Sequence, residues 1–221
     1  MNHPTVSVRV EGEMALWTRP ETKFERVSYP LPTPSGARGV LEAIYWHPQF
    51  LWRIRRIAVL KRGETFSILR NEVNSKMVPS AGVLYPSEDR AQRHAVMLKN
   101  VAYNIEAEVV PKDGGPPAEK HRDIFRRRVE RGQCHHRPVL GTRECAAEFE
   151  PLREGERPVP WDEDLGLMLW DLDFGARKGI APPLFFRAEV RGGVMEVPSH
   201  PLGREVAAAG LAEMAFSGRP A

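Results

Sequence analysis

The chain has 221 residues, of which 42% are hydrophobic and 28% are charged, and its formal net charge is +3. This length allows one large domain or two small ones, and this composition is typical of a folded protein. The apolar runs are too short to span a membrane, the N-terminus lacks a secretory pattern, and two cysteines cannot form a disulfide framework. We therefore expect a cytoplasmic protein that does not associate with membranes.

The start of the chain predicts a strand followed by a helix. Residues 5–11 alternate apolar and polar side chains, as a half-buried strand does. After three closely spaced prolines, Ser35 is predicted to cap a helix that contains GARGVLEAIYW. Pro48 is predicted to end that helix.

The middle of the chain predicts two further strands separated by a less regular stretch. Residues 53–60 form an apolar run with a basic start, and residues 101–109 alternate apolar and polar side chains. Between these strands, residues 61–97 are expected to be irregular, with a hairpin around 66–73 and a loop within 79–86.

A loop and a basic helix complete the first predicted domain. The segment KDGGPP predicts the loop, and residues 118–131 predict the helix, which Gly132 ends. Residues 142–149 are expected to return to the sheet as a strand. The resulting order β-α-β-β-α-β predicts a ferredoxin-like (RRM-like) domain over residues 1–150, and many RNA-binding modules use such a sheet.

The C-terminal part predicts a smaller unit. Residues 151–160 are typical of a linker, and three apolar stretches within 151–198 predict the strands of a small antiparallel β-sheet domain. Residues 199–221 are rich in alanine and glycine and are expected to form a C-terminal tail with a short helix. The predicted fold class is therefore α+β, with a ferredoxin-like domain followed by this small domain.

Basic residues concentrate in one short segment. Residues 120–143 contain eight Lys and Arg against two Asp and Glu, whereas residues 144–221 contain eight against fourteen. Arginine supplies 25 of the 32 basic residues. A GC-rich genome would also raise the arginine content, but it does not explain the clustering. A basic segment beside an acidic one favours a polyanionic partner such as nucleic acid.

Three residues are candidates for acid–base chemistry on a phosphate. Lys120 and His121 open the predicted basic helix, where free N–H groups and the helix dipole attract phosphate. A lysine there can stabilise a phosphorane and a histidine can move protons near neutral pH, as RNA cleavage by the adjacent 2′-oxygen requires. The alternative is that His121 lies at the edge of the core. Tyr45 shares an apolar helix face with Leu41, so it too has a core role as its alternative.

The basic helix also carries candidate RNA contacts. An arginine-rich surface can follow an RNA backbone, although the same residues can simply coat a solvated helix face. The four candidates are Arg122, Arg126, Arg127 and Arg128. The phase of a helix suggests that not all four can contact one strand.

Metal binding is the weaker interpretation of the remaining polar residues. The candidates for a zinc site are Cys134, His135, His136 and Cys145, but adjacent histidines rarely bind one ion and no C-x-x-C pair is present. Asp171 and Asp173 share one strand face, which suits a divalent metal or simple exposure to solvent. We expect no metal and no cofactor.

A specific resemblance is carried by long blocks of sequence between residues 6 and 198: TRPETKFERVSYPLPTPSGARGVLEAIYWHPQF, SILRNEV, VAYNIEAEV, KHRDIFRRRVERGQCHHRPVLGTREC and FFRAEVRGGVMEVP. Together they resemble the Dvulg-subtype Cas protein of type I-C CRISPR systems, in the RAMP superfamily. The resemblance implies an endoribonuclease that cleaves CRISPR precursor RNA at the 3′ base of the repeat hairpin. It also implies that the protein keeps the repeat tag of the mature crRNA inside the surveillance complex, beside the backbone subunit and the large subunit.

The resemblance also implies a role for each candidate residue. The family's tyrosine falls on Tyr45, and its Lys-His pair falls on Lys120 and His121. His121 would transfer a proton, Lys120 would stabilise the charge on the phosphate, and Tyr45 would orient or help deprotonate the 2′-hydroxyl. The proton roles of Tyr45 and His121 can be exchanged. Two alternatives stay open: a non-catalytic subunit that only binds the crRNA tag, and a metal-dependent DNA nuclease that uses the aspartates at 171 and 173.

Overall fold

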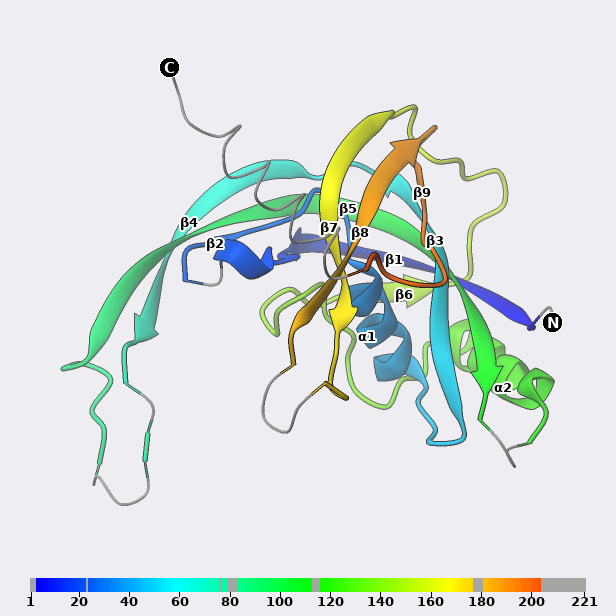
Figure 1. Ribbon diagram of the computed structural model, residues 1–221, viewed down its shortest axis with the longest axis horizontal. Coiled ribbons are helices and arrows are strands. Elements are labelled where there is room, and N and C mark those ends of the chain that lie inside the picture. The colour runs from blue at the N-terminus through cyan, green and yellow to red at the C-terminus, as the bar shows by residue number, and fades with distance from the viewer. Residues whose placement is uncertain are drawn as a thin grey trace.

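The computed structural model describes residues 3–22, 24–75, 77–78, 83–112, 116–176 and 181–203. Over these residues the protein consists mainly of strands, with two α-helices, so the predicted α+β class is confirmed (Figure 1). No helix in these ranges is long and apolar enough to cross a membrane. The helix predicted in the C-terminal tail lies outside the described residues, as do parts of the predicted loops at 79–86 and 112–117.

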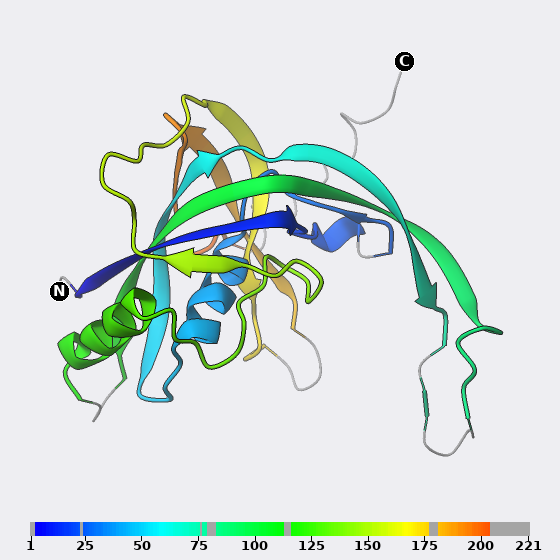
Figure 2. The same cartoon turned by 180° about the vertical axis from the view of Figure 1, so that it is seen from behind.

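Among the described residues, nine strands form one curled sheet whose main path has the order β6-β1-β5-β3-β9-β8-β7. The strands are β1 Thr5–Ala15, β2 Arg26–Val27, β3 Phe50–Lys61, β4 Glu64–Val73, β5 Arg90–Pro111, β6 Glu148–Glu150, β7 Glu163–Leu172, β8 Pro183–Arg191 and β9 Val194–Glu196. Neighbours along the path are antiparallel. Off the path, β4 pairs antiparallel and β2 pairs parallel with β5. Helix α1 lies within the curve of the sheet, and α2 lies at the end of the sheet near the N-terminus (Figures 1 and 2).

The core forms where alternating apolar residues of β1 and β5 face the helices. Val8 lies opposite Ile105 and Val10 lies opposite Tyr103, and all four side chains are fully buried. The predicted strands at 5–11 and 101–109 are therefore confirmed, and both are longer than predicted.

Helix α1 (Pro34–Ile44) has its N-cap two residues before the predicted cap. Thr33, and not Ser35, is the N-cap, because the Thr33 hydroxyl accepts a hydrogen bond from the Gly36 N–H at 3.0 Å. Pro34 occupies the first helical position, where its fixed φ and missing N–H cost nothing. The prediction that the helix includes Tyr45 and runs to Pro48 is wrong. The helix ends at Ile44, and Tyr45 is extended with φ −152° and ψ 120°.

The prediction of an irregular stretch over 61–97 is wrong for residues 64–73 and 90–97, which belong to two long strands and not to a hairpin around 66–73. β4 and the first half of β5 form a long two-stranded arm, paired from Glu64 opposite Lys99 to Val73 opposite Arg90. The arm projects from the body of the sheet (Figure 2). The alternation of apolar and polar residues in the arm is hard to recognise in the sequence. Residues on its inner face, such as Phe66 and Ile68, are only half-buried, and an apolar residue, Leu69, is exposed on its outer face.

The segment between α2 (Ala118–Glu130) and β6 is a loop for most of its length, so the strand predicted at 142–149 is wrong before residue 148. A tight turn replaces it, in which the Leu140 N–H donates to the Cys145 carbonyl at 2.7 Å. Gly141 has φ +97°, and a Cβ there would meet the Leu16 carbonyl, so only glycine fits. The predicted basic helix ending at Gly132 is confirmed.

The three C-terminal strands predicted within 151–198 are confirmed as β7, β8 and β9. β9 pairs with β3 over Arg56–Ala58, so these strands continue the sheet. The predicted division into residues 1–150, 151–198 and 199–221 stays a prediction.

Candidate active site

Tyr45 is fixed where α1 gives way to β3. Its backbone N–H donates to the Leu41 carbonyl at 2.8 Å, and its own carbonyl accepts a hydrogen bond from the Trp52 indole at 3.0 Å. Its ring stacks on Phe50, with 5.7 Å between ring centres. Because hydrogen bonds fix both the N–H and the carbonyl of Tyr45, its side chain points in one defined direction at the end of α1.

His121 reaches the same place from the first turn of α2. One stripe of this helix is buried against the sheet: Ala118, His121, Phe125 and Val129. His121 is only 2% exposed, and its ring lies 4.6 Å from Phe50 and 5.2 Å from His47, measured between ring centres. The Tyr45 hydroxyl lies 2.9 Å from His121 Nδ1, a hydrogen bond between residues 76 positions apart in the sequence.

The second imidazole nitrogen of His121 has no such contact. Nε2 is buried and finds no hydrogen-bond partner within the described part of the chain. Buried polar atoms without a partner are uncommon in native proteins, and a catalytic role is one explanation for such an atom. When Nδ1–H donates to the Tyr45 oxygen, Nε2 carries the free lone pair and can accept a proton.

The surroundings keep both groups uncharged near neutral pH. Burial lowers the pKa of His121, and the nearby His47 and Lys120 lower it further. Burial raises the pKa of Tyr45, against the opposing effect of the Arg128 charge. Tyr45 is therefore a poor base, whereas neutral His121 is well suited to take a proton.

Lys120 and the candidate arginines lie around this pair in different ways. Lys120 is exposed beside His121, on the first turn of α2, where the N-cap Pro117 provides no side-chain cap. Arg128 contacts the site itself, because its guanidinium lies 5.0 Å from the centre of the Tyr45 ring and donates to the Ile44 carbonyl at 2.7 Å.

The other three arginines do not reach the pair. Arg122 donates to Asp123 at 2.8 Å. Arg126 and Arg127 are exposed on another side of α2, and Arg126 makes a long contact of 3.4 Å to the Thr5 carbonyl. The four arginines therefore do not form one surface, as the helix phase predicts.

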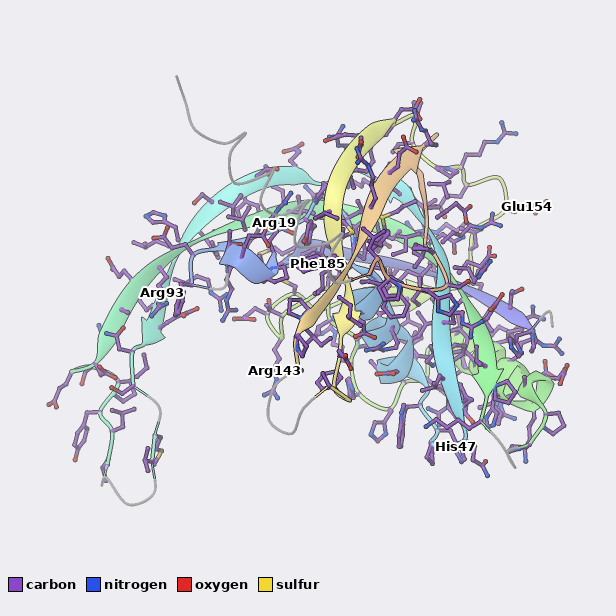
Figure 3. The ribbon with its side chains drawn as sticks, in the orientation of Figure 1. Arg19, His47, Arg93, Arg143, Glu154 and Phe185 are labelled. Atoms are coloured by element: carbon purple, nitrogen blue, oxygen red, sulfur yellow. The ribbon has the colours of Figure 1, made fainter. Side chains whose placement is uncertain are left out.

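His47 is a residue of the site that the sequence did not reveal. It lies in the turn between α1 and β3 (Figure 3), and its ring centre is 5.2 Å from that of His121. Its Nδ1 accepts a long hydrogen bond of 3.3 Å from the Gln49 N–H. Its only sequence signal is its position two residues after Tyr45 in the turn that Pro48 continues.

Two of the candidate metal ligands, Asp171 and Cys145, have other partners. Asp171 accepts hydrogen bonds from both terminal nitrogens of Arg38, and buried Cys145 contacts Thr142 at 3.4 Å, while Cys134 is exposed. In the described ranges, no group of three or more His, Cys, Asp or Glu side chains is placed to hold a metal ion.

Comparisons with known proteins point to one family. A family model described as "CRISPR-associated protein (Cas_Cas5)" matches residues 5–198. A protein of Thermus thermophilus named CRISPR pre-crRNA endoribonuclease Cas5d is 45% identical over 212 residues, which cover 88% of this chain and 91% of the relative. A protein of the same name from Mannheimia succiniciproducens is 40% identical over 216 residues, which cover 87% and 94%.

Two solved structures share the fold. A crystal structure described as a CRISPR-associated protein has a TM-score of 0.66 and 23% identity, and it covers 90% of this chain and 93% of that chain. The functionally uncharacterized protein SMU1763c from Streptococcus mutans has a TM-score of 0.65 and 19% identity, with coverage of 89% and 93%. At these identities, the likeness shows the fold alone.

Proposed function

The chain belongs to the CRISPR-associated Cas5d family, and from this we propose that it is an endoribonuclease that cleaves CRISPR precursor RNA at the base of the repeat hairpin. Two relatives that match over most of their length carry the name CRISPR pre-crRNA endoribonuclease. The structural observation that carries the proposal is the contact between the Tyr45 hydroxyl and His121 Nδ1, with Lys120 alongside. The proposal includes retention of the crRNA tag in a type I-C complex with the backbone and large subunits.

We extend the proposal to the fold of residues 1–150 as a ferredoxin-like domain. In support of it, β1, α1, β3, β5, α2 and β6 follow one another in the chain with the short β2 and β4 between them, and β5 lies between β1 and β3 in the sheet. This arrangement contains the split βαβ unit, in which one strand separates the two strands that a helix connects.

In the proposed reaction the RNA supplies its own nucleophile and no metal takes part. The 2′-hydroxyl on the 5′ side of the scissile phosphate loses its proton to His121 Nε2, and its oxygen bonds to phosphorus. The bond from phosphorus to the 5′-oxygen breaks, which leaves a 2′,3′-cyclic phosphate. The released 5′-oxygen takes a proton from water and becomes a hydroxyl.

Each residue of the site has one task in this scheme. Lys120 stabilises the extra negative charge on the phosphorane. The Tyr45 hydroxyl forms a hydrogen bond with His121 Nδ1 and so orients the imidazole. In the tautomer in which Nδ1–H donates to the Tyr45 oxygen, Nε2 can act as a base. Because Nε2 is covered in the free protein, the RNA has to displace part of this cover when it binds.

Incubation of a repeat-hairpin RNA with the protein, with and without a chelator, tests the proposal. We expect cleavage that persists in chelator and that His121→Ala lowers at least about 100-fold. His94→Ala is the matched control, since His94 is exposed on the arm. Binding without any cleavage would support the non-catalytic tag-binding subunit. Cleavage that requires a metal and survives in His121→Ala would contradict the mechanism.

A further inference from the structure

One proton of the proposed reaction has no donor among the side chains assigned so far: the proton that the departing 5′-oxygen takes up. In the scheme above it comes from water, which is a weak acid with a pKa of about 15.7. A side chain that donates a proton to a leaving group typically raises a rate by about 100- to 10,000-fold. The site therefore gains most from a titratable group that lies beside His121 and is open to solvent.

His47 is the accessible member of the rings around His121. Three rings lie next to His121 within the described part of the chain, with their centres 6.0, 5.2 and 4.6 Å from its own: Tyr45, His47 and Phe50. Tyr45 and Phe50 are buried, whereas His47 is partly exposed. A phosphate that reaches His121 from solvent therefore also comes next to His47.

The backbone determines which nitrogen of His47 is free. Nδ1 accepts the hydrogen bond of 3.3 Å from the Gln49 N–H, and Nε2 makes no hydrogen bond within the described residues. The turn that carries the ring is itself held at the end of β5, because the Gln49 carbonyl accepts the Lys112 N–H at 2.8 Å. Nε2 carries a proton both in this neutral tautomer and in the imidazolium, so it is the nitrogen that can donate to a ligand.

The charges of the site favour a protonated His47 beside a neutral His121. Burial lowers the pKa of His121, and the charges of His47 and Lys120 lower it further. An imidazolium at His47 therefore keeps His121 in the neutral form that a base requires. Because His47 is partly exposed, water solvates its charge, and a bound phosphate stabilises that charge further.

The other two polar side chains of the site are less suited to this task. The Tyr45 hydroxyl contacts Nδ1 of His121, so it is directed at the nitrogen that does not act as the base, and it is buried. Lys120 already stabilises the phosphorane charge in the scheme. General acid catalysis is most efficient for a group that titrates near the operating pH, as histidines do.

From these observations we propose that His47 is the general acid of the reaction and delivers the proton to the departing 5′-oxygen in place of water. The inference rests on the proposed function, because it takes His121 as the base at the same phosphate. An in-line displacement places the attacking and leaving oxygens on opposite sides of phosphorus. Two imidazoles with centres 5.2 Å apart are close enough for one phosphate to contact both.

The two histidines exchange roles over one turnover. The 2′-hydroxyl proton moves to His121 Nε2 as the 2′-oxygen bonds to phosphorus. The Nε2 proton of His47 moves to the 5′-oxygen as its bond to phosphorus breaks. The products are the 2′,3′-cyclic phosphate and the 5′-hydroxyl. Exchange with water then removes one proton from His121 and returns one to His47.

The test uses a repeat-hairpin RNA in which sulfur replaces the 5′-oxygen at the scissile phosphate. A thiol has a pKa of about 8.5, the reference value for cysteine, so a thiolate departs without a proton donor. His47→Asn is the informative variant. The asparagine Oδ1 can still accept the Gln49 N–H, but the amide cannot release a proton near neutral pH.

Single-turnover cleavage at saturating RNA gives the readout. His47→Asn should cleave the ordinary RNA at least about 100-fold more slowly than the parent but cleave the 5′-sulfur RNA at the parent's rate. His121→Ala should be slow on both RNAs, because the 2′-hydroxyl still has to lose its proton. His135→Asn is the matched control and should cleave both RNAs as the parent does. His135 is exposed in the loop after α2, and only its backbone N–H holds the Ala43 carbonyl. Thermal unfolding of each variant confirms that it is folded.

The inference and the proposed function fail in different ways. If the parent cleaves the ordinary RNA and His47→Asn does so at the same rate, His47 is not the acid and the inference is wrong. If His47→Asn loses the same factor on both RNAs, the ring only positions the substrate and the inference is also wrong. If sulfur restores the rate of Tyr45→Phe and not that of His47→Asn, Tyr45 is the acid. If the parent cleaves neither RNA, the proposed function itself fails, and the inference falls with it.

Discussion

Replacing Tyr45 with phenylalanine separates the chemical role of its hydroxyl from the packing role of its ring. The ring keeps its stacking on Phe50 and its contact with the Arg128 guanidinium. Only the hydrogen bond of 2.9 Å to His121 Nδ1 is lost. Since Nε2 has no partner among the described residues, both nitrogens of a buried imidazole are then unpaired.

The structure sets the size of two separate effects. A buried polar group left without its partner costs about 1–3 kcal/mol, so the free energy of unfolding of Tyr45→Phe should fall by that amount. For a chain of this size, the melting temperature should fall by about 2–12 °C. Loss of the hydrogen bond that orients the His121 imidazole should lower the cleavage rate by about 100-fold, the lower end of an acid–base contribution.

Single-turnover cleavage and thermal unfolding, measured on the same preparations, distinguish these effects. Tyr29→Phe is the matched control, because the Tyr29 hydroxyl is buried and accepts a hydrogen bond from the Leu169 N–H at 3.3 Å. This control should lose stability but keep its cleavage rate. In a His121→Ala background, Tyr45→Phe should have little further effect on the rate, since the two residues act as one unit. A Tyr45→Phe variant that melts earlier but cleaves at the parent rate would refute the catalytic role of the Tyr45–His121 hydrogen bond.

Three other predictions address the nucleophile, the basic helix and the pH dependence. One 2′-deoxy nucleotide on the 5′ side of the scissile phosphate should stop cleavage without changing the Kd, and cleavage of that RNA would show that water is the nucleophile. Arg126→Ala/Arg127→Ala should weaken binding to many RNA sequences alike and reduce the salt slope by about one unit for each phosphate interaction removed, whereas an unchanged slope would show a solvated face. Because the pKa of His121 is lowered in the folded protein, the unfolded chain binds more protons below about pH 6.5, the ordinary value for histidine. The stability that this shift contributes is complete above that pH and is lost as the pH falls toward the folded pKa, so urea unfolding between pH 5 and 8 should show a smaller acid loss for His121→Asn than for the parent. An equal loss in both proteins would contradict the shift.

Local patterns in the sequence predict the elements that local physics decides. The alternation of Val6, Val8 and Val10 predicts β1, and all three side chains are buried. The cap of α1 falls on Thr33 and not on the chemically similar Ser35, and Pro34 is the signal that separates them, since proline favours the first helical position.

Contacts between distant parts of the chain are the features that such patterns miss. The arm is a strand pair with one half-buried face and no core on the other, so its alternation is weak and its pairing depends on β5. The hydrogen bond between Tyr45 and His121 joins residues that no spacing rule connects, and only the family resemblance brought them together before the fold was known. His47 joins the site through the turn after α1, and neither route identified it.

The narrow pairing between β3 and β9 has a consequence for the folding of the nascent chain. Only Arg56–Ala58 and Val194–Glu196 pair there, although more than 130 residues separate them in the sequence. At a synthesis rate of about 5–20 residues per second, the ribosome needs roughly 7–27 s to add that stretch. Until β9 emerges, this edge of β3 presents unpaired N–H and C=O groups that can pair with a neighbouring chain. Contacts between residues so distant in sequence also form slowly. Docking of β9 is therefore the late step that ends the exposure of this edge to aggregation during translation.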